Sequence, residues 1–318
     1  AADTANDITW WENGLDTGVT SWTEHTIDGS FNSARDVYAI DLDKDGDMDV
    51  LGAGAGADDI TWWENDGSES FTERTIDSEF SSAYAIYAID LDEDGDIDVL
   101  GAANGNDVDY DIAWWENDGT PSNGGWTEYT IDSTFDKARD VYATDIDGDG
   151  DIDVVGASYG DNDINWWEND GSESFTQHAI DTSFSNANSA YAIDVDNDGD
   201  IDVVVFNSRQ KPTILRNETI NGNGWVKIGL RGISSNYYGI GAQVRVISGS
   251  LFQMAEVHSG RSYQSHYGQL LHFGLGKNKI IDSIEVRWPS GITDTYEGIP
   301  INKCLLLREG SIKVQYTP

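Results

Sequence analysis

The first 205 residues consist of short runs in which apolar and polar residues alternate, separated by Gly, Asp and Asn. Alternation over four to eight residues, rich in β-branched and aromatic side chains, is typical of a half-buried β-strand. No stretch of this region carries a sustained helical period. The pattern therefore predicts an all-β region of short strands and tight turns.

The same runs recur along the region as a repeat. The string WWEN occurs four times at intervals of 52 residues, at 10–13, 62–65, 114–117 and 166–169. A run of the form F/W-T-x-x-x-I-D follows it each time, at 22–28, 71–77, 126–132 and 175–181. N-D-G turns link these last two runs in three of the repeats. Each unit reads as four strands, which is the size of a β-propeller blade.

The repeat is incomplete at both ends of the region. The chain starts with a third and a fourth strand, at 8–13 and 22–28, and the last unit supplies strands at 190–194 and 201–206. A degenerate third strand follows at 213–217, where WWEN has become LRN. The two half-units either pair within the chain and close a ring of about four blades, or pair between molecules, or belong to a larger propeller. Pairing would remove exposed sheet edges.

A second region without the repeat begins at Glu218. Its strand-like runs are separated by Gly, Asn, Ser and Pro, and lie at 225–230, 242–248, 252–257, 270–275, 281–288 and 304–309. This pattern predicts a compact β-sandwich or barrel. We therefore expect two domains, a repeat domain at 1–217 and a second β domain at 218–318.

Charge divides the chain at the same place. The net charge is −40, but residues 1–205 carry −46 and residues 206–318 carry +6. So acidic a chain lacks the basic footprint that nucleic acid requires. No apolar run approaches the about 18 residues of a membrane span, and the single cysteine, Cys304, excludes an intrachain disulfide. The two regions are complementary, which favours docking of the second domain on its own repeats or on those of another copy.

Four aspartate loops of the form D-x-D-x-D-G-D-x-D lie between the first and second strands of the units. Calcium takes six to eight oxygen ligands, and alternating carboxylates on a tight loop supply them. Five carboxylates within nine residues would oppose folding without a cation. We expect about four Ca²⁺ ions with a structural role, held by Asp41, Asp43, Asp45, Asp47, Asp49, Asp90, Asp92, Asp94, Asp96, Asp98, Asp145, Asp147, Asp149, Asp151, Asp153, Asp194, Asp196, Asp198, Asp200 and Asp202. The seventh residue of each loop should contribute its backbone carbonyl, and the glycine before it should adopt a left-handed backbone.

These motifs resemble two known families. The aspartate loop followed by a small-residue strand (DVLGAGAG, DVLGAANG, DVVGASYG) is similar to the FG-GAP or VCBS repeats of calcium-binding β-propellers, which usually have seven blades. Residues 217–310 resemble the ASPIC/UnbV domain of bacterial secreted proteins and of cartilage acidic protein-like chains, through RNETINGNGWVKIGLRG, SNYYGIGAQVRV, LHFGLG and EVRWPSG. The resemblance implies an extracellular setting and assigns no chemistry to the second domain.

Other candidate sites have structural alternatives. We expect the first Trp of each WWEN pair to pack between neighbouring blades, whereas packing and an exposed platform for sugar rings are equally open for the second Trp. In the second domain, His272 is predicted to be structural. His258 and His266 flank a Gly-Arg-Ser turn and are candidates for a surface metal or anion site. No catalytic triad, phosphate loop or distinctive carboxylate pair is present, so we expect no enzyme.

Together these features favour a secreted or cell-surface, calcium-stabilised, non-catalytic binding or scaffold protein. Its expected partner is a protein or a glycan at the cell surface, or copies of itself, with head-to-tail contacts that grow into a filament. The alternative is a carbohydrate-binding lectin or a polysaccharide-active enzyme, with the Trp rows and acidic rim as its groove.

Overall fold

The computed structural model describes residues 6–13, 22–105, 112–196, 198–208, 211–218, 222–257 and 270–317. Within these residues every long element is a strand, and the one helical segment is a 3-10 turn, η2 (Pro121–Asn123). The expected all-β architecture is therefore confirmed.

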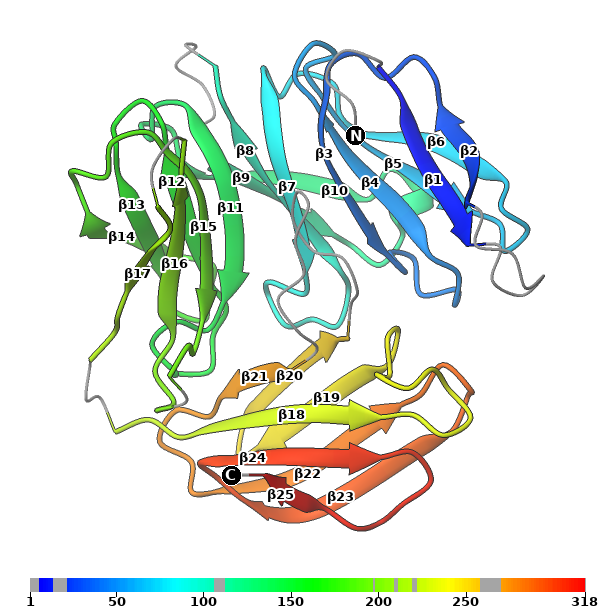
Figure 1. The fold of residues 1–318 in the computed structure, drawn as a ribbon, viewed down its shortest axis with the longest axis vertical. Coiled ribbons are helices and arrows are strands. Elements are labelled where there is room, and N and C mark those ends of the chain that lie inside the picture. Colours follow the sequence, from blue (N-terminus) through cyan, green and yellow to red (C-terminus); the bar gives the residue numbers. More distant parts are fainter. Residues whose placement is uncertain are drawn as a thin grey trace.

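The repeats form separate small antiparallel sheets in chain order (Figure 1). Three sheets have four strands, a two-stranded sheet precedes them, and a three-stranded sheet follows them. The two-stranded sheet contains β1 (Ile8–Asn13) and β2 (Trp22–Asp28). The four-stranded sheets contain β3 (Ala34–Ile40), β4 (Asp49–Gly54), β5 (Asp59–Asn65) and β6 (Phe71–Asp77); β7 (Ala83–Ile89), β8 (Asp98–Ala103), β9 (Ile112–Asn117) and β10 (Trp126–Asp132); and β11 (Ala138–Thr144), β12 (Asp153–Ser158), β13 (Ile164–Asn169) and β14 (Phe175–Asp181). The last contains β15 (Ala187–Ile193), β16 (Asp202–Asn207) and β17 (Thr213–Leu215).

The first strands of successive sheets lie beside one another, with β3 against β7, β7 against β11 and β11 against β15. A tyrosine from each strand continues this contact, and the ring centroids of neighbours are 4.6–5.4 Å apart. The row consists of Tyr38, Tyr87, Tyr142 and Tyr191. The sheets therefore radiate from a shared line of inner strands.

The two incomplete sheets do not pair with each other. In the described residues β1 and β2 bond only to one another, and β16 lies between β15 and β17. Figure 1 shows these sheets on opposite sides of the repeat domain. The alternative in which the half-units close a four-bladed ring within the chain is therefore wrong for this structure. Each incomplete sheet instead keeps a free edge.

The Trp pairs hold neighbouring sheets together. The second Trp packs between sheets: Trp115 is 1% exposed, meets Phe80 edge to face, and donates a 3.1 Å hydrogen bond to Asp77 Oδ2 of the preceding sheet. A Cβ on Gly101 would lie 2.8 Å from the Trp115 ring, which explains the small residue in the second strand. Trp63 and Trp167 repeat this packing with Phe31 and Phe135.

The first Trp of each pair stacks on a side chain of its own sheet, while Trp62 and Trp114 also belong to the buried core that several sheets share. Trp114 stacks on Tyr129 and Trp166 on His178, both from the fourth strand. Alternation assigns the two rings to opposite faces, but it does not say which face meets the neighbouring sheet. Because Trp62, Trp63, Trp114, Trp115 and Trp167 are at most 2% exposed, these rings form no open platform for a sugar.

The second domain is a sandwich of two four-stranded sheets. One sheet has the order β21-β18-β24-β25 and the other β20-β19-β22-β23, and side chains of both fill one core. Its strands are β18 (Trp225–Arg231), β19 (Gln243–Ser248), β20 (Leu251–Glu256), β21 (Leu271–Gly274), β22 (Ile280–Arg287), β23 (Thr293–Pro300), β24 (Lys303–Arg308) and β25 (Gln315–Thr317). Sequence analysis missed β23 and β25. In β23 the buried residues Tyr296 and Ile299 are three positions apart, with Gly298 between them, so the strand shows no alternation in the sequence.

We expect Trp115→Ala to lower the free energy of unfolding of the repeat domain by about 3–5 kcal/mol, because it removes a buried ring and leaves a cavity between two sheets. The matched control is Trp11→Ala, at the equivalent position of β1, where the side chain is 54% exposed; we expect a loss below about 1 kcal/mol. Urea unfolding followed by fluorescence measures both. Equal losses would contradict the assignment of the second Trp to the joint between sheets.

Candidate metal centres

The four aspartate loops lie at one rim of the repeat domain, between the first and second strands of each sheet. We number them loop 1 (residues 41–49), loop 2 (90–98), loop 3 (145–153) and loop 4 (194–202). Because the first strands lie side by side, their loops also become neighbours. The repeat thus concentrates twenty aspartates on one edge of the domain.

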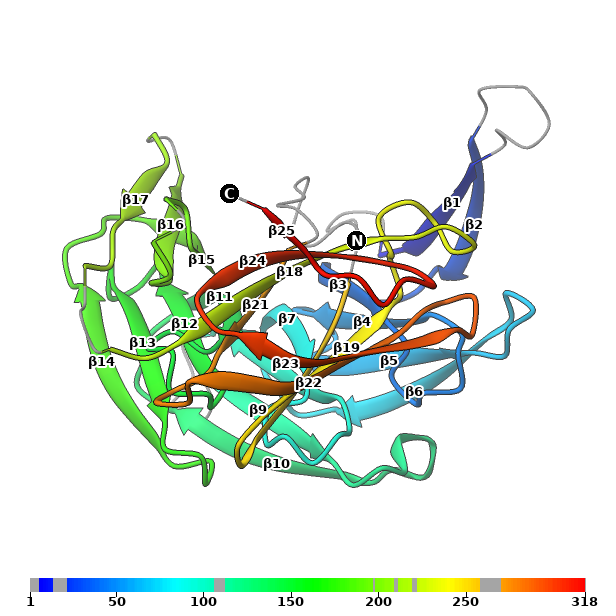
Figure 2. The ribbon, with the colours of Figure 1, turned by 90° about the horizontal axis from the view of Figure 1, so that it is seen from below.

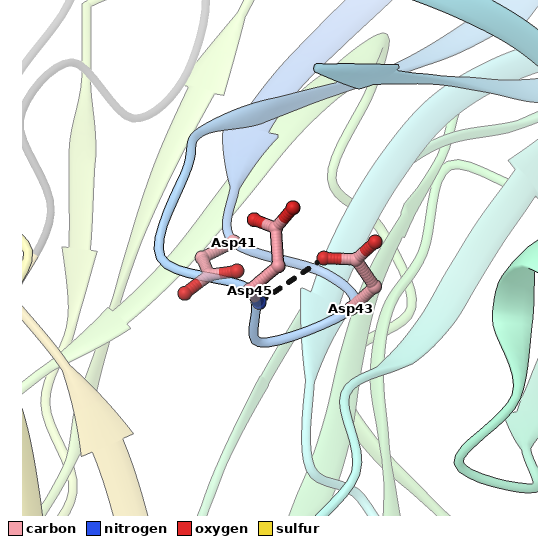
Figure 3. A group of neighbouring side chains, drawn as sticks. All are labelled: Asp41, Asp43 and Asp45. Carbon is pink, nitrogen blue, oxygen red and sulfur yellow. Dashed lines mark hydrogen bonds between the residues drawn. The ribbon is translucent and has the colours of Figure 1, made fainter. Parts of the chain in front are cut away.

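Each loop brings three carboxylates together, with one oxygen from each lying within 4.8 Å of the others. Figure 3 shows the group in loop 1, where the side chains of Asp41, Asp43 and Asp45 converge. The members are Asp41, Asp43 and Asp45; Asp90, Asp92 and Asp94; Asp145, Asp147 and Asp153; and Asp194, Asp196 and Asp202. The remaining predicted residues fall outside these groups: Asp47, Asp49, Asp96, Asp98, Asp149, Asp151, Asp198 and Asp200.

Local hydrogen bonds shape the loops. The backbone N–H of Asp45 donates to Asp43 Oδ1 at 3.2 Å, and that of Asp47 donates to Asp45 Oδ1 at 2.9 Å. Gly46 then adopts a φ of 104°, the left-handed conformation predicted for it. The side chain of Asp47 lies against the N-D-G turn, since a Cβ on Gly67 would be 2.4 Å from its Oδ2. A pattern local in sequence therefore suffices to build the loop.

The ninth aspartate of each loop is a buried anchor. Asp49 is fully buried; its Oδ2 accepts the Leu42 N–H at 3.0 Å and its Oδ1 accepts the Asn65 N–H at 2.8 Å. Asp98, Asp153 and Asp202 make the same pair of bonds in their own loops. This carboxylate ties the loop to the last residue of WWEN, which explains why the two motifs recur together.

Burial of so many acids raises their pKa values. Desolvation lifts the pKa of Asp49 to about 7 against opposing backbone hydrogen bonds. It also lifts the pKa of Asp90 to about 7, with repulsion from Asp92 and Asp94 adding to the shift. In loop 3, burial holds the pKa values of Asp145 and Asp153 well above the usual range. The ionised loops are therefore under electrostatic stress.

A cation fits these groups. Asp41 Oδ1 and Asp90 Oδ2 are buried and make no hydrogen bond, which is costly for a carboxylate oxygen unless another ligand meets it. Hard divalent cations prefer clustered carboxylate and carbonyl oxygens of this kind. The donor set and the orphaned oxygens both favour a metal in loops 1 and 2.

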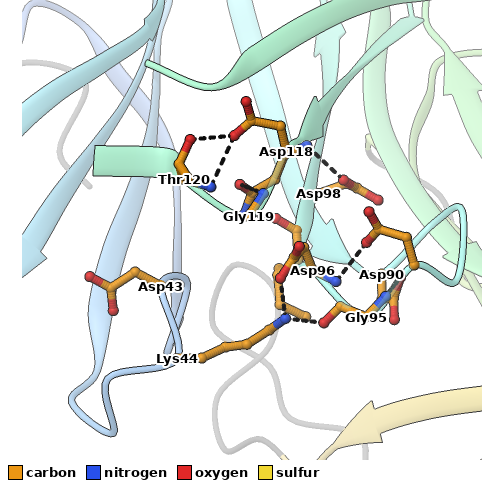
Figure 4. A network of polar contacts seen from close by, with 12 residues as sticks. Asp43, Lys44, Asp90, Gly95, Asp96, Asp98, Asp118, Gly119 and Thr120 are labelled. Carbon is orange, nitrogen blue, oxygen red and sulfur yellow. Dashed lines mark hydrogen bonds and ion pairs between the residues drawn. The ribbon is translucent and has the colours of Figure 1, made fainter. Parts of the chain in front are cut away.

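The fourth residue of a loop reaches the next loop along the rim. The Lys44 ammonium of loop 1 contacts the Gly95 carbonyl and the Asp96 carboxylate of loop 2 (Figure 4). Glu93 occupies the same position in loop 2, and its pKa rises to about 8 through burial and through repulsion from Asp151, Asp90 and Asp149. An ion pair thus joins loops 1 and 2, whereas loops 2 and 3 repel each other through their carboxylates.

Sequence analysis missed the WWEN glutamates as neighbours of the loops. Glu64 repels Asp43, Glu116 repels Asp92, and Glu168 repels Asp147, and each contributes to the raised pKa of its aspartate. The available signal was the return of WWEN after each of the first three loops, 21, 24 and 21 residues beyond the first aspartate. These glutamates place further negative charge beside the second aspartate of loops 1–3.

The second domain covers part of the rim. In Figures 1 and 2 it lies across the ends of the inner strands that carry the loops. The N–H of Gly276 donates to the Gly148 carbonyl at 2.8 Å, and Asn223 Nδ2 donates to the Asp147 carbonyl at 2.9 Å. Lys227 of β18 reaches Asp194 of loop 4. The complementary charges seen in the sequence therefore meet within one chain.

The structure describes one of the predicted histidine positions and not the other two. His272 lies on β21 and stacks with Trp225, and desolvation lowers its pKa to about 4. A neutral ring packed on Trp225 agrees with the structural role predicted for it. His258 and His266 lie outside the described residues, so their surface site stays a prediction.

Comparison with known families supports the repeat assignment. The model described as an FG-GAP-like repeat matches three overlapping stretches, residues 41–101, 90–155 and 145–205, which together span more than half of the chain. The model described as ASPIC and UnbV matches residues 232–314. Each of the three repeat matches begins at the first aspartate of a loop. Among the curated proteins, none matches the chain.

Several solved structures are distantly similar. A lectin of Agrocybe aegerita that recognises non-reducing terminal N-acetylglucosamine is 16% identical over 66% of this chain and 60% of its own, with a TM-score of 0.43. The chain thus spans less than two thirds of that lectin. A protein from Lactobacillus plantarum is 12% identical over 98% of this chain and 82% of its own (TM-score 0.41). The V. cholerae biofilm matrix protein Bap1 is 14% identical over 96% of this chain and 52% of its own (TM-score 0.38).

Metal-depleted protein should become less stable as the pH rises from about 4.5 to 7.5. Asp49 and Asp90 have pKa values of about 7 when folded and about 4 when unfolded. Over that interval the folded state holds protons that the unfolded state has released, so raising the pH favours unfolding. Thermal melting at low salt measures the trend. A saturating divalent cation should weaken or reverse it, because binding needs the ionised carboxylates. A melting temperature that climbs with pH in metal-depleted protein would contradict the stressed-loop description.

Proposed function

The chain belongs to the family of FG-GAP-like repeat proteins and carries an ASPIC and UnbV domain, and on that premise we propose that it is an extracellular, calcium-stabilised, non-catalytic binding or scaffold protein. The observation that carries this proposal is the rim of aspartate clusters, in which Asp41 Oδ1 and Asp90 Oδ2 are buried and make no hydrogen bond. The proposal has four parts: the metal, the architecture, the location and the partner.

Calcium is the proposed metal. The loops offer carboxylate and carbonyl oxygens without His or Cys, a donor set that suits calcium better than zinc or copper. Asp41, Asp43 and Asp45 would hold it in loop 1. The groups in loops 2 and 3 are Asp90, Asp92 and Asp94, and Asp145, Asp147 and Asp153. Bound there, calcium would supply positive charge to a loop that fastens the first strand to the second. Its proposed role is therefore structural.

We propose that the repeat sheets are blades of a β-propeller. The inner strands β3, β7, β11 and β15 lie side by side, and a Trp–Phe–Asp joint recurs between the complete sheets. Successive sheets joined by the same contact must rotate about a common axis. This geometry supports a propeller even though the sheets described here form an open arc.

An extracellular location suits the proposed metal. Weak calcium sites are filled by the millimolar calcium found outside cells. Among the described residues, no helix is long and apolar enough to cross a membrane. We therefore propose a secreted or cell-surface protein.

The proposed partner is a protein or glycan at the cell surface, or a second copy of the chain. The incomplete sheets expose Trp11 and Trp22 at one end and Phe206 and Ile214 at the other, between 48% and 66% exposed. A free strand edge with apolar side chains is a template for another strand. Repeated head-to-tail pairing of such edges would produce a filament.

Calcium should raise the thermal stability of the protein sharply. Binding to the folded state alone adds about 2.7 kcal/mol for each site when the ion is present at 100 times its Kd. Differential scanning fluorimetry in millimolar calcium and in excess chelator measures the shift, with magnesium as the control ion. Asp90→Asn should reduce the calcium shift, whereas Asp118→Asn, in an exposed turn, should leave it unchanged. Superimposable melting curves with and without chelator would rule out the structural calcium.

A self-assembling scaffold and a polysaccharide-active enzyme can be distinguished by the native mass of the protein and by the release of reducing sugar. We expect the native mass from light scattering to grow with protein concentration in calcium, and Ile214→Asp to keep the chain monomeric by placing a charge on the free edge of β17. We also expect no reducing sugar to be released from a panel of polysaccharides. Sugar release would favour the polysaccharide-active alternative, and glycan binding without release would favour a lectin. A stable monomer at high concentration would argue against self-assembly.

A further inference from the structure

Loop 4 differs from the other loops in the residue that faces its second aspartate. Strand β17 pairs with β16 in the register in which β13 pairs with β12, so Leu215 occupies the place of Trp167. Arg216 therefore occupies the place of Glu168. The next residue confirms the alignment, since Asn217 N donates to the ninth aspartate of loop 4 as Asn169 N does in loop 3. The glutamate that follows the second Trp in the other repeats is therefore replaced by an arginine in this one.

The Arg216 guanidinium uses that position to bind the loop. It forms an ion pair with Asp196, lies 3.4 Å from Asp198 Oδ2, and its Nε lies 3.0 Å from Glu218 Oε1. In loops 1–3 the second aspartate, which corresponds to Asp196, is repelled by a glutamate instead. The side chain of Arg216 is 54% exposed, so its pairs are partly screened by water.

A second cation reaches the first aspartate of loop 4 from the other domain. Lys227 Nζ lies 2.8 Å from Asp194 Oδ2 and 3.3 Å from the Asp194 carbonyl oxygen. The side chain of Lys227 is 5% exposed and that of Asp194 is fully buried. Trp225, also on β18, packs on the loop so closely that a Cβ on Gly199 would lie 1.9 Å from its Nε1. Strand β18 is thus seated on loop 4.

Among the described residues, the first aspartates of the other loops pair with no such cation. Asp41 and Asp90 each bury an oxygen that makes no hydrogen bond. Asp145 accepts the backbone N–H groups of Gly148 and Gly150 at 2.7 and 3.1 Å. In loop 2, Lys44 lowers the pKa of Asp90 through its charge while it contacts Gly95 and Asp96. In loop 4, Lys227 pairs with the first aspartate and Arg216 with the second. Together they bring two positive charges, the charge of one divalent cation.

We infer that loop 4 is, beside loop 3, a docking receptor for the second domain and not a fourth calcium site, with Arg216 and Lys227 occupying the carboxylates that a metal binds in loops 1–3. The metal half of this inference rests on the proposed calcium function, whereas the docking half does not. A buried ion pair strongly opposes the loss of one partner, because the other charge stays buried. Calcium at loop 4 and docking of β18 would therefore exclude each other.

Calcium stoichiometry tests the metal half. Calorimetry on the full chain should give three calcium ions for the natural sequence and four for the double variant Arg216→Glu, Lys227→Met, which restores the glutamate and removes both cations. The matched control is Glu168→Arg, which imposes the loop 4 arrangement on loop 3 and should give two ions. Four ions in the natural chain, or three in the double variant, would overturn the inference. An absence of binding in every form would instead contradict the proposed calcium function.

Small-angle scattering in excess chelator tests the docking half independently of calcium. Lys227→Met should increase the radius of gyration as the second domain leaves the rim. Lys303→Met, an exposed lysine of the same domain, should leave the radius unchanged and serves as the control. Circular dichroism establishes that both variants keep their strands. Identical scattering from the two variants would overturn docking through Lys227.

Discussion

Charge crowding at one rim of the repeat domain is the constraint on which the rest of the structure depends. Each first strand ends in a loop of five aspartates, and Asp151 and Asp149 of loop 3 lie close enough to raise the pKa of Glu93 in loop 2. Ionised and buried, these groups would oppose folding unless each charge is compensated. The molecule uses backbone N–H groups at the ninth aspartate, protein cations at Lys44, Arg216 and Lys227, and oxygen clusters suited to a metal.

The compensation is distributed unevenly, and this gives the repeats different roles. In each of loops 1–3 a glutamate repels the second aspartate. This added negative charge favours binding of an external cation. In loop 4, Asp196 pairs with Arg216 and Asp194 pairs with Lys227 of the second domain. A repeat whose copies were identical could form an array but would have no preferred place for a second domain. The pair of Lys227 with Asp194 and the seat of Trp225 on Gly199, together with the contacts of Gly276 and Asn223 to loop 3, supply that preference.

The joints between sheets explain why the repeat tolerates this variation. The second Trp, the Phe before the next first strand and a small residue in the second strand form one interlocked contact. This contact is apolar and lies away from the loops, so charges on the rim can change without altering the way sheets pack. Stability and specificity thus reside in different parts of the same unit.

The sequence alone determined the strands, the loops and their recurrence, because alternation, turn residues and spacing are local properties. It also identified the family and the left-handed glycine of the loops, such as Gly46. Only the tertiary structure decided which Trp fills the joint, that the half-units stay apart, and that Arg216 and Lys227 meet loop 4. These outcomes depend on which faces and edges meet after folding. Alternation gives a side chain one of two faces, but the partner on that face is fixed by contacts between residues far apart in the chain.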